Sequence, residues 1–415
     1  MLSIAIGVYT LYIFINIYVS VMQIGYLSQA KKGKNVLLGV SEFIQAGEYA
    51  ISKERLKLVS SLVELAAFIF WIGYGIAWLD SQFFSLSPTW HMIALVLSFI
   101  LISSLITLPF ELYQKFVLDE KYGFNKSTFA LYIKDTLIST VLTIVIGGLV
   151  VWGVGSIMMN VQMWWLYSFA FIFGVIILVN MFFPTVRALF FDKVTPLEDG
   201  ELKSSIEAMM DKTGFVSSGI FVSDASKRDA RLNAYFGGVG KTKRVVLFDT
   251  LIQKLSAKEL LAVLGHELGH FAHGDIYKNM GLMGLLLFVM FALFGNLDED
   301  LFLQMGLSES AGVIMVLFML FMPVLGFIMM PLMGIVSRHN EFEADKTGAE
   351  LGGGEHLASA LQKLVSENKS FPLSHPLYIF FHYTHPPVME RLKELGIDIH
   401  NQSTDASAGE CPITQ

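Results

Sequence analysis

The sequence has little cysteine and little charge, and both shortages narrow what the protein can be. Its single cysteine, Cys411, excludes an internal disulfide framework and a zinc site built from cysteines, so any bound metal must be held by histidines and carboxylates. Only 16% of the 415 residues are charged, against roughly 25% in soluble proteins. The chain also lacks a basic excess, because its net charge is -7, and this argues against nucleic acid as a partner.

The chain is rich instead in long apolar stretches. Hydrophobic residues make up 54% of it and the mean hydropathy is +0.57, values typical of an integral membrane protein. A helix needs about 20 apolar residues to cross a bilayer, and seven stretches meet this requirement. We therefore predict a mainly α-helical, polytopic protein with seven transmembrane helices, over residues 3–27, 57–79, 90–112, 135–159, 163–190, 279–297 and 309–336.

The distribution of basic residues predicts the orientation of these spans. The segments after the first and third spans are rich in lysine and arginine, whereas the N-terminus and the connections 80–89, 160–162 and 298–308 contain neither. Because cytosolic loops carry the positive charge, we expect an extracytosolic N-terminus and a cytosolic C-terminus. The alternation runs through all seven spans without a violation.

The less apolar segments predict a single cytosolic domain that the last two spans interrupt. Residues 1–190 hold the first five spans, 279–336 hold the last two, and 401–415 form a polar tail. We expect segments 191–278 and 337–400 to build an α+β, gluzincin-like zinc-protease domain. Three strand-like runs at 219–224, 230–236 and 244–248 predict a small antiparallel sheet, and capping boxes at Thr195 and Ser256 predict two helix starts.

The second of these helices carries the motif His266-Glu267-Leu268-Gly269-His270. Histidines four residues apart project from one face of a helix and can bind one Zn²⁺, while the glutamate between them lies near the open coordination position. Zinc lowers the pKa of its bound water, and Glu267 is predicted to act as general base and then to protonate the leaving amine. The motif therefore predicts a hydrolase that cleaves amide bonds, with one zinc ion per chain.

The third zinc ligand must come from elsewhere in the chain. The metzincin pattern would need Gly at position 273 and His at position 276, but the chain has His273 and Ile276, so that class is excluded. The best candidate is Glu341, with Asp345 one helical turn later as the residue that holds a ligating histidine. Asp275 either caps its own helix or holds a ligating histidine.

Four further residues are candidates for contacting the substrate or the transition state. His385 and Arg391 offer hydrogen-bond donors for the charge that develops on the tetrahedral oxygen, although their segment alone is typical of a turn followed by a helix start. Asn233 and Ala234 begin a run that offers a strand edge to an extended substrate. His382, nearby, is interpreted as a packing or surface histidine.

Taken together, these motifs resemble the type I CAAX prenyl proteases, membrane zinc endopeptidases that cleave isoprenylated C-terminal CAAX proteins. The resemblance extends over nearly the whole chain. It rests on the motifs Pro109-Phe110-Glu111-Leu112-Tyr113, Phe116 to Asn125, Thr195-Pro196-Leu197, Asn233-Ala234, HExxH, Ser337-Arg338, Glu341-Phe342, Ala344-Asp345, His385-Pro386-Pro387 and Glu390-Arg391.

The resemblance implies a role for each candidate and a shape for the membrane part. It implies zinc binding by His266, His270 and Glu341, with Glu267 as the base. It also implies that Asn233, His385 and Arg391 contact the substrate or stabilise the transition state. The implied architecture is a ring of seven helices around a large water-filled chamber, capped by the zinc domain on the cytosolic side, with peptides or proteins lipidated at the C-terminus as substrates.

Some features depart from the pattern of eukaryotic members. The chain is shorter than expected, has no dilysine retrieval ending and carries Asp275 where those members tend to have another residue. These departures suggest a bacterial homologue in the inner membrane; a eukaryotic one would belong in the endoplasmic reticulum. In a bacterium without prenylated proteins, the natural substrate would be open.

Two other functions compete with CAAX proteolysis. One is a membrane quality-control zinc protease resembling the HtpX heat-shock family, which shares HExxH and the later glutamate but has fewer spans. The other is a non-enzymatic scaffold or transporter with a structural zinc ion, suggested by the seven spans and by Glu64 within the second of them. Structural zinc sites usually close all four coordination positions, which makes this reading the weaker one.

Overall fold

The structure is a computed structural model that describes residues 2–237 and 243–397, so the predicted polar tail at 401–415 lies outside the described residues. Among the described residues, seven helical stretches are long and apolar enough to cross a membrane. The predicted fold class, a mainly helical polytopic protein with seven spans, is confirmed. The spans are Leu2–Ala30, Val40–Gln82, Pro88–Asp119, Phe129–Asn160, Trp164–Phe190, Asp275–Phe294 and Ala311–Gly352.

Several of these spans combine α-helical and π-helical segments. In chain order they are α1 (Leu2–Ala30), α2 (Val40–Phe70), η1 (Trp71–Gly75), α3 (Ile76–Gln82), α4 (Pro88–Tyr113), η2 (Gln114–Asp119), α5 (Phe129–Leu142), η3 (Thr143–Gly147), α6 (Gly148–Asn160), α7 (Trp164–Phe190), α11 (Asp275–Phe294) and α13 (Ala311–Gly352). The remaining helices are α8 (Glu201–Thr213), η4 (Ala225–Lys227), α9 (Asp249–Lys254), α10 (Ala257–Ala272), α12 (Glu299–Gln304), α14 (Gly354–Glu367), α15 (Pro376–His382) and α16 (Val388–Glu394).

The helices extend beyond the predicted spans because hydropathy detects only the part of a helix that suits lipid. Helix α2 begins at Val40, well before the predicted start at 57, and its first turns bury Phe43 and Ala46 against the C-terminal part of the chain. Helix α13 continues without a break to Gly352. The segment after the predicted seventh span is therefore the end of the spanning helix.

The small sheet is mixed, and the prediction of an antiparallel sheet was wrong in this respect. Its strands are β1 (Val194–Pro196), β2 (Ile220–Ser223), β3 (Ala234–Gly237) and β4 (Arg244–Phe248), in the order β1-β2-β4-β3. Strand β4 lies between β2 and β3, so it pairs parallel with β2 and antiparallel with β3. The predicted strand at 230–236 starts only at Ala234, because Arg231 is held outside the sheet by Asp119 and Asp229.

The helix start predicted at Thr195 was also wrong. Residues Val194–Pro196 form β1, in which Thr195 pairs with Val222, and α8 begins at Glu201. Strand β1 is an edge strand, where a proline is tolerated because one side of the strand needs no N–H donor. The helix start predicted at Ser256 is confirmed.

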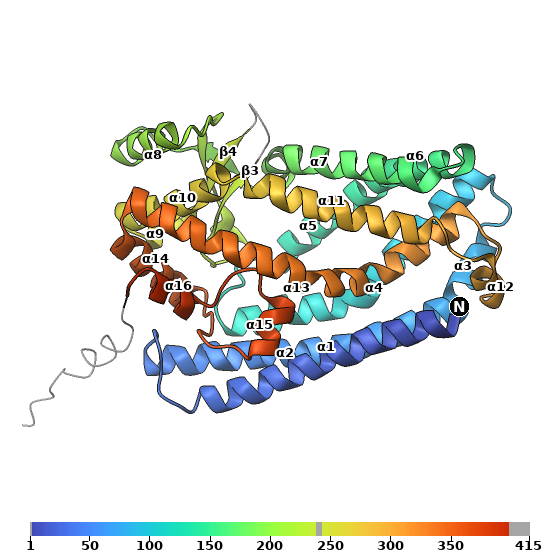
Figure 1. The fold of residues 1–415 in the computed structure, drawn as a ribbon, viewed down its shortest axis with the longest axis horizontal. Coiled ribbons are helices and arrows are strands. Elements are labelled where there is room, and N and C mark those ends of the chain that lie inside the picture. Colours follow the sequence, from blue (N-terminus) through green and yellow to red (C-terminus); the bar gives the residue numbers. More distant parts are fainter. Residues whose placement is uncertain (1, 238–242, 398–415) are drawn as a thin grey trace, which may run out of the picture.

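Most elements of the two soluble segments gather at one end of the molecule, whereas α15 lies beside the spanning helices α1 and α13 (Figure 1). Helices α8, α9, α10, α14 and α16 lie there around the sheet, whereas α3, α12 and the N-terminus lie at the other end. Helix α13 runs from the region of α12 to this cluster and contacts α10 and α15. One continuous helix therefore joins the membrane core to the soluble domain.

Candidate metal centre

Helix α10 supplies the two histidines, and its sequence favours a helix at this place. Ser256 caps it: the Ser256 Oγ accepts from the Glu259 backbone N–H at 3.4 Å, and the Glu259 Oε2 accepts from the Ser256 N–H at 2.8 Å. Buried Leu260, Leu264 and Leu268 form an apolar stripe that packs toward the sheet. His266 and His270 follow on a neighbouring face.

Helix α13 supplies Glu341, and glycines allow it to approach α10 closely. A Cβ atom at Gly348 would lie 2.9 Å from the His266 backbone nitrogen, and one at Gly352 would lie 2.3 Å from the Ala262 Cα. Any side chain at these positions would push the two helices apart. The close packing therefore brings Glu341 to the histidines.

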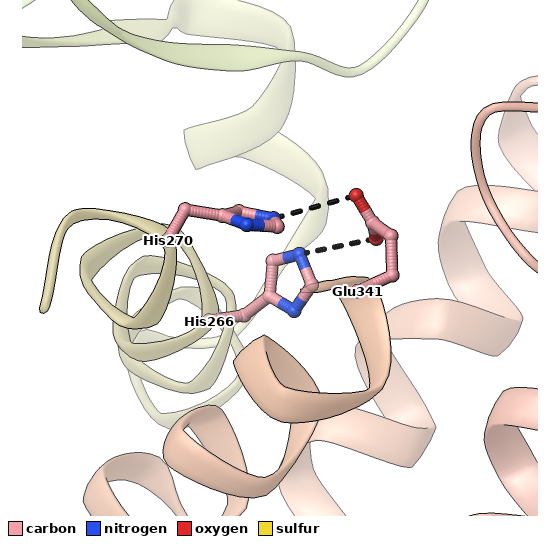
Figure 2. A group of neighbouring side chains, drawn as sticks. All are labelled: His266, His270 and Glu341. Carbon is pink, nitrogen blue, oxygen red and sulfur yellow. Dashed lines mark ion pairs between the residues drawn. The ribbon is translucent and has the colours of Figure 1, made fainter. Parts of the chain in front are cut away.

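The side chains of His266, His270 and Glu341 converge between the two helices (Figure 2). One possible ligand atom from each residue lies within 4.8 Å of those of the other two. The Glu341 Oε2 is 3.5 Å from the His266 Nε2, and the Glu341 Oε1 is 3.3 Å from the His270 Nε2. Among the described residues, this is the one group of histidines and acidic side chains that meets the criterion for a metal site.

These separations fit a zinc ion. Ligand bonds of about 2.0–2.1 Å at tetrahedral angles place ligand atoms about 3.3–3.4 Å apart. Glu341 is only 3% exposed, and its Oε2 is buried without a hydrogen-bond partner, a costly arrangement unless a cation satisfies it. Burial opposes a charge on His270, but its bonds to Glu341 and Asp275 outweigh this and raise its pKa to about 9. The site thus favours positive charge.

A second carboxylate stands behind each histidine. Asp345 Oδ1 lies 2.8 Å from the His266 Nδ1, and Asp275 Oδ2 lies 2.9 Å from the His270 Nδ1. An ionised carboxylate can only accept, so both Nδ1 atoms carry a proton, and a neutral ring then keeps its Nε2 lone pair for a metal ion. Of the two alternatives for Asp275, the structure therefore shows the contact with a histidine of the motif.

Arg391 is drawn into the same cluster from α16. Its Nε and Nη2 donate to the two oxygens of Asp345 at 2.8 and 2.6 Å, and its Nη1 lies 3.6 Å from the Glu341 Oε2. Asp345 is 1% exposed, so this is a buried, bidentate ion pair. Glu267 is half-buried on α10, and its charge acts on both His270 and Arg391.

His385 also contacts Glu341 and remains accessible. Its Nε2 lies 3.2 Å from the Glu341 Oε1, and its side chain is 64% exposed. The segment that carries it is held by Arg338, one turn before Glu341 on α13, whose Nη1 donates to the Tyr383 carbonyl at 2.6 Å. The sequence showed Arg338 within a motif but offered no role for it, because its acceptors are backbone carbonyls that lie 41 to 45 residues further along the chain.

Asn233 and Ala234 lie at the sheet edge instead of among the metal-site side chains. Asn233 is exposed, and its Oδ1 accepts from the Ala234 N–H at 2.8 Å. Ala234 begins β3, which pairs only with β4 and leaves its other side unpaired within the described sheet. An unpaired strand edge of this kind can receive an extended peptide.

Comparisons with known proteins agree with this architecture. A family model described as peptidase family M48 matches residues 196–397, and one described as CAAX prenyl protease N-terminal, five membrane helices, matches residues 36–193. CAAX prenyl protease 1 of Saccharomyces cerevisiae is 38% identical over 315 residues, covering 71% of this chain and 69% of that protein. The human CAAX prenyl protease 1 homolog is 33% identical over 346 residues, covering 71% of each.

A solved structure is similar over almost the full length. The crystal structure of S. mikatae Ste24p superposes with a TM-score of 0.86 at 32% sequence identity, covering 95% of this chain and 98% of that one. The seven spans among the described residues also weigh against the HtpX-like alternative, for which fewer spans were expected.

Proposed function

We propose that this protein hydrolyses peptide bonds near the C-terminus of prenylated substrates. The premise is that the chain belongs to peptidase family M48 and is a membrane metalloprotease of the CAAX-processing type. The observation that carries the proposal is the convergence of His266, His270 and buried Glu341 at spacings that suit zinc. The same geometry speaks against a structural zinc site, since three ligands leave the fourth position open.

Some residues of the metal centre are proposed to bind the metal, and Glu267 is proposed to transfer protons. Zinc held by His266, His270 and Glu341 would supply a Lewis acid that polarises the scissile carbonyl and makes water more acidic. Glu267 takes a proton from the attacking water and delivers it to the leaving amine. Asp345 and Asp275 keep the Nε2 atoms of the histidines free to bind the metal.

His385 and Arg391 are proposed to stabilise the tetrahedral oxygen, and they do so from different positions. His385 is accessible and can turn its Nε2 from Glu341 toward a substrate. The Arg391 Nε and Nη2 donate to Asp345, so only its Nη1, which lies 3.6 Å from the Glu341 Oε2, is left to act on developing charge. An extended substrate would lie along β3, beginning at Asn233 and Ala234.

We further propose that the membrane part is hollow. Only 11% of the apolar window in Phe129–Asn160 and 6% of that in Trp164–Phe190 is buried. Helices at the wall of a water-filled chamber would be exposed on two sides in this way, whereas helices in a solid bundle would bury one face. The zinc domain and the C-terminus would lie in the cytosol, with the protein in the endoplasmic reticulum or the bacterial inner membrane.

The test uses the purified protein with a prenylated CAAX peptide and a measurement of bound zinc. Glu267→Gln should keep its zinc and lose hydrolysis by about 10²-fold or more, since general acid–base catalysis contributes 10²–10⁴-fold. Glu341→Gln should lose zinc as well. Glu343→Gln is the matched control, because Glu343 lies on the same helix as Glu341, but its exposed side chain pairs with Lys346. Hydrolysis at the wild-type rate by Glu267→Gln would refute its role as the base.

A further inference from the structure

Lys57 on α2 is a half-buried cation with an unusual partner. Its Nζ lies 3.1 Å from the Nε2 of His382, at the end of α15, and 5.4 Å from the centre of the Tyr378 ring. No carboxylate of the described residues forms an ion pair with it. A half-buried cation without a carboxylate partner is costly, so Lys57 is a candidate for binding an anionic ligand.

The two nearby carboxylates form hydrogen bonds with tyrosines, although the Glu54 Oε2 is buried without a partner. Glu54 Oε1 accepts from the Tyr378 hydroxyl at 2.6 Å, and Glu64 Oε1 accepts from the hydroxyls of Tyr9 and Tyr12 at 3.0 and 3.2 Å. They moderate the positive charge of Lys57 without occupying its donors. Two of the three ammonium N–H groups therefore remain for a ligand.

The contact with Lys57 also determines the tautomer of His382. An ammonium group can only donate, so the His382 Nε2 accepts and its Nδ1 carries a proton. Burial and the neighbouring Lys57 lower the pKa of His382 to about 4, which keeps the ring neutral at physiological pH. The pair thus offers the remaining ammonium N–H groups, held in place by a neutral imidazole acceptor, to a carboxylate or a phosphate.

The position of this pair relates it to the metal centre. His382 and His385 line one cavity of about 330 Å³, to which Lys57 is connected through His382 without lining it, and His385 lies 3.2 Å from Glu341. Three residue steps separate the two histidines, so their Cα atoms are at most about 11 Å apart. An extended peptide of about three residues covers the same distance.

We propose that Lys57, positioned by His382, binds the free C-terminal carboxylate of the substrate, two to three residues beyond the bond that is cut. This inference rests on the proposed function and adds to it a substrate class, peptides with a free carboxyl end. It also gives the site a way to measure length, since the anion site lies at a set distance from the metal centre. A phosphate of a lipid headgroup has related chemistry and is the competing ligand.

The experiment compares a prenylated CAAX peptide that ends in a free carboxylate with the same peptide amidated at its C-terminus. The wild-type protein should show a KM at least tenfold lower for the acid. Lys57→Met should raise the KM of the acid to that of the amide while kcat stays within about threefold, and Lys57→Arg should restore the preference. Lys53→Met is the matched control, since Lys53 is exposed one turn earlier on α2 and should keep the full preference.

Binding of both peptides to Glu267→Gln, measured by fluorescence anisotropy, separates this inference from the proposed function. A preference for the acid in that background, lost with Lys57→Met, supports the carboxylate site even if the wild-type protein hydrolyses neither peptide. Equal affinity of the Glu267→Gln protein for acid and amide overturns the proposed carboxylate site. An equal effect of Lys57→Met on the binding of both peptides also overturns it, because Lys57 would then only hold α15 against α2. Stabilisation by phosphatidylglycerol that depends on Lys57, with an unchanged acid-to-amide ratio, would assign the site to lipid and also overturn it. If Lys57→Met fails to fold, the ratios of acid to amide affinity measured for wild type and Lys57→Arg still decide whether the carboxylate site exists.

Discussion

Asp345 connects a proposed zinc ligand to a buried arginine, and replacing it with asparagine should affect both. The Asp345 carboxylate accepts from the His266 Nδ1 at 2.8 Å and from Arg391 at 2.6 and 2.8 Å. Loss of a residue that orients a metal ligand typically reduces metal affinity by about 10–100-fold. Loss of one partner of a buried ion pair costs about 3–5 kcal/mol of stability. Asp345→Asn should therefore weaken zinc binding and also destabilise the fold.

The two effects can be measured separately. Zinc affinity is read by competition with a chelator, and stability by the thermal transition of the metal-free protein. In Asp345→Asn, the unpaired Arg391 would be drawn toward Glu341, now 3.6 Å from its Nη1, and would compete with the metal. Adding Arg391→Met should recover much of the lost stability, because no buried charge is then left unpaired. It should not restore full zinc affinity, because His266 still lacks its acceptor.

Asp275→Asn is the matched comparison at the other histidine. Asp275 pairs with Lys278, whose side chain is 51% exposed and can return to water when the aspartate is lost. We expect a loss of zinc affinity of about tenfold, at the lower end of the range, with a smaller change in stability. If Asp345→Asn binds zinc as tightly as wild type while losing stability, Asp345 is only a partner for Arg391, and the reasoning about His266 is refuted.

Two further predictions concern residues that position the site. Arg338→Gln should lower kcat about tenfold with little change in zinc content or KM, because the segment carrying His385 loses its hydrogen bond at the Tyr383 carbonyl. Arg338→Lys should recover part of the lost kcat. A changed zinc content would show that the substitution acts through Glu341 instead. Burial opposes ionisation of Glu259, but Lys363, Ser359 and Ser256 outweigh it and lower its pKa to about 2. Its stabilising effect is therefore present above the usual value of about 4.3 and lost as the pH falls toward 2. Glu259→Gln should destabilise the protein by about 1–3 kcal/mol at pH 7. Thermal unfolding at a series of pH values should show the difference in stability between wild type and variant shrinking below pH 4 and vanishing near pH 2. A difference as large at pH 2 as at pH 7 would contradict the assignment.

The part of the site that could be predicted from the sequence is the part that depends on local spacing. Histidines four residues apart must share a helical face, and Glu341 and Asp345 must do the same, so both pairs were identified before any tertiary contact was known. The predicted count of spans followed from apolar length. The capping box at Ser256 was likewise readable because both of its hydrogen bonds lie within four residues.

Contacts between distant segments could not be predicted in this way. The placement of β4 between β2 and β3 depends on pairings that no local pattern encodes, and this is why the sheet is mixed. At Thr195, pairing with β2 outweighed a local capping pattern. His382 was interpreted as a packing or surface residue because its partner, Lys57, lies 325 positions earlier in the chain.

Helix α13 also determines where the chemistry takes place relative to the lipid. At 1.5 Å per residue, Glu341 lies about 45 Å along the helix from Ala311. If the helix followed the membrane normal and entered the hydrocarbon layer at its first residue, Glu341 would stand at most about 15 Å beyond the far boundary of a layer about 30 Å thick. In a substrate whose lipid is attached next to the bond that is cut, the lipid would have to leave the bilayer by up to that distance. The protein would then act as a lipid-extracting enzyme, and the transfer of that chain out of the membrane would be part of its energetic cost in every turnover.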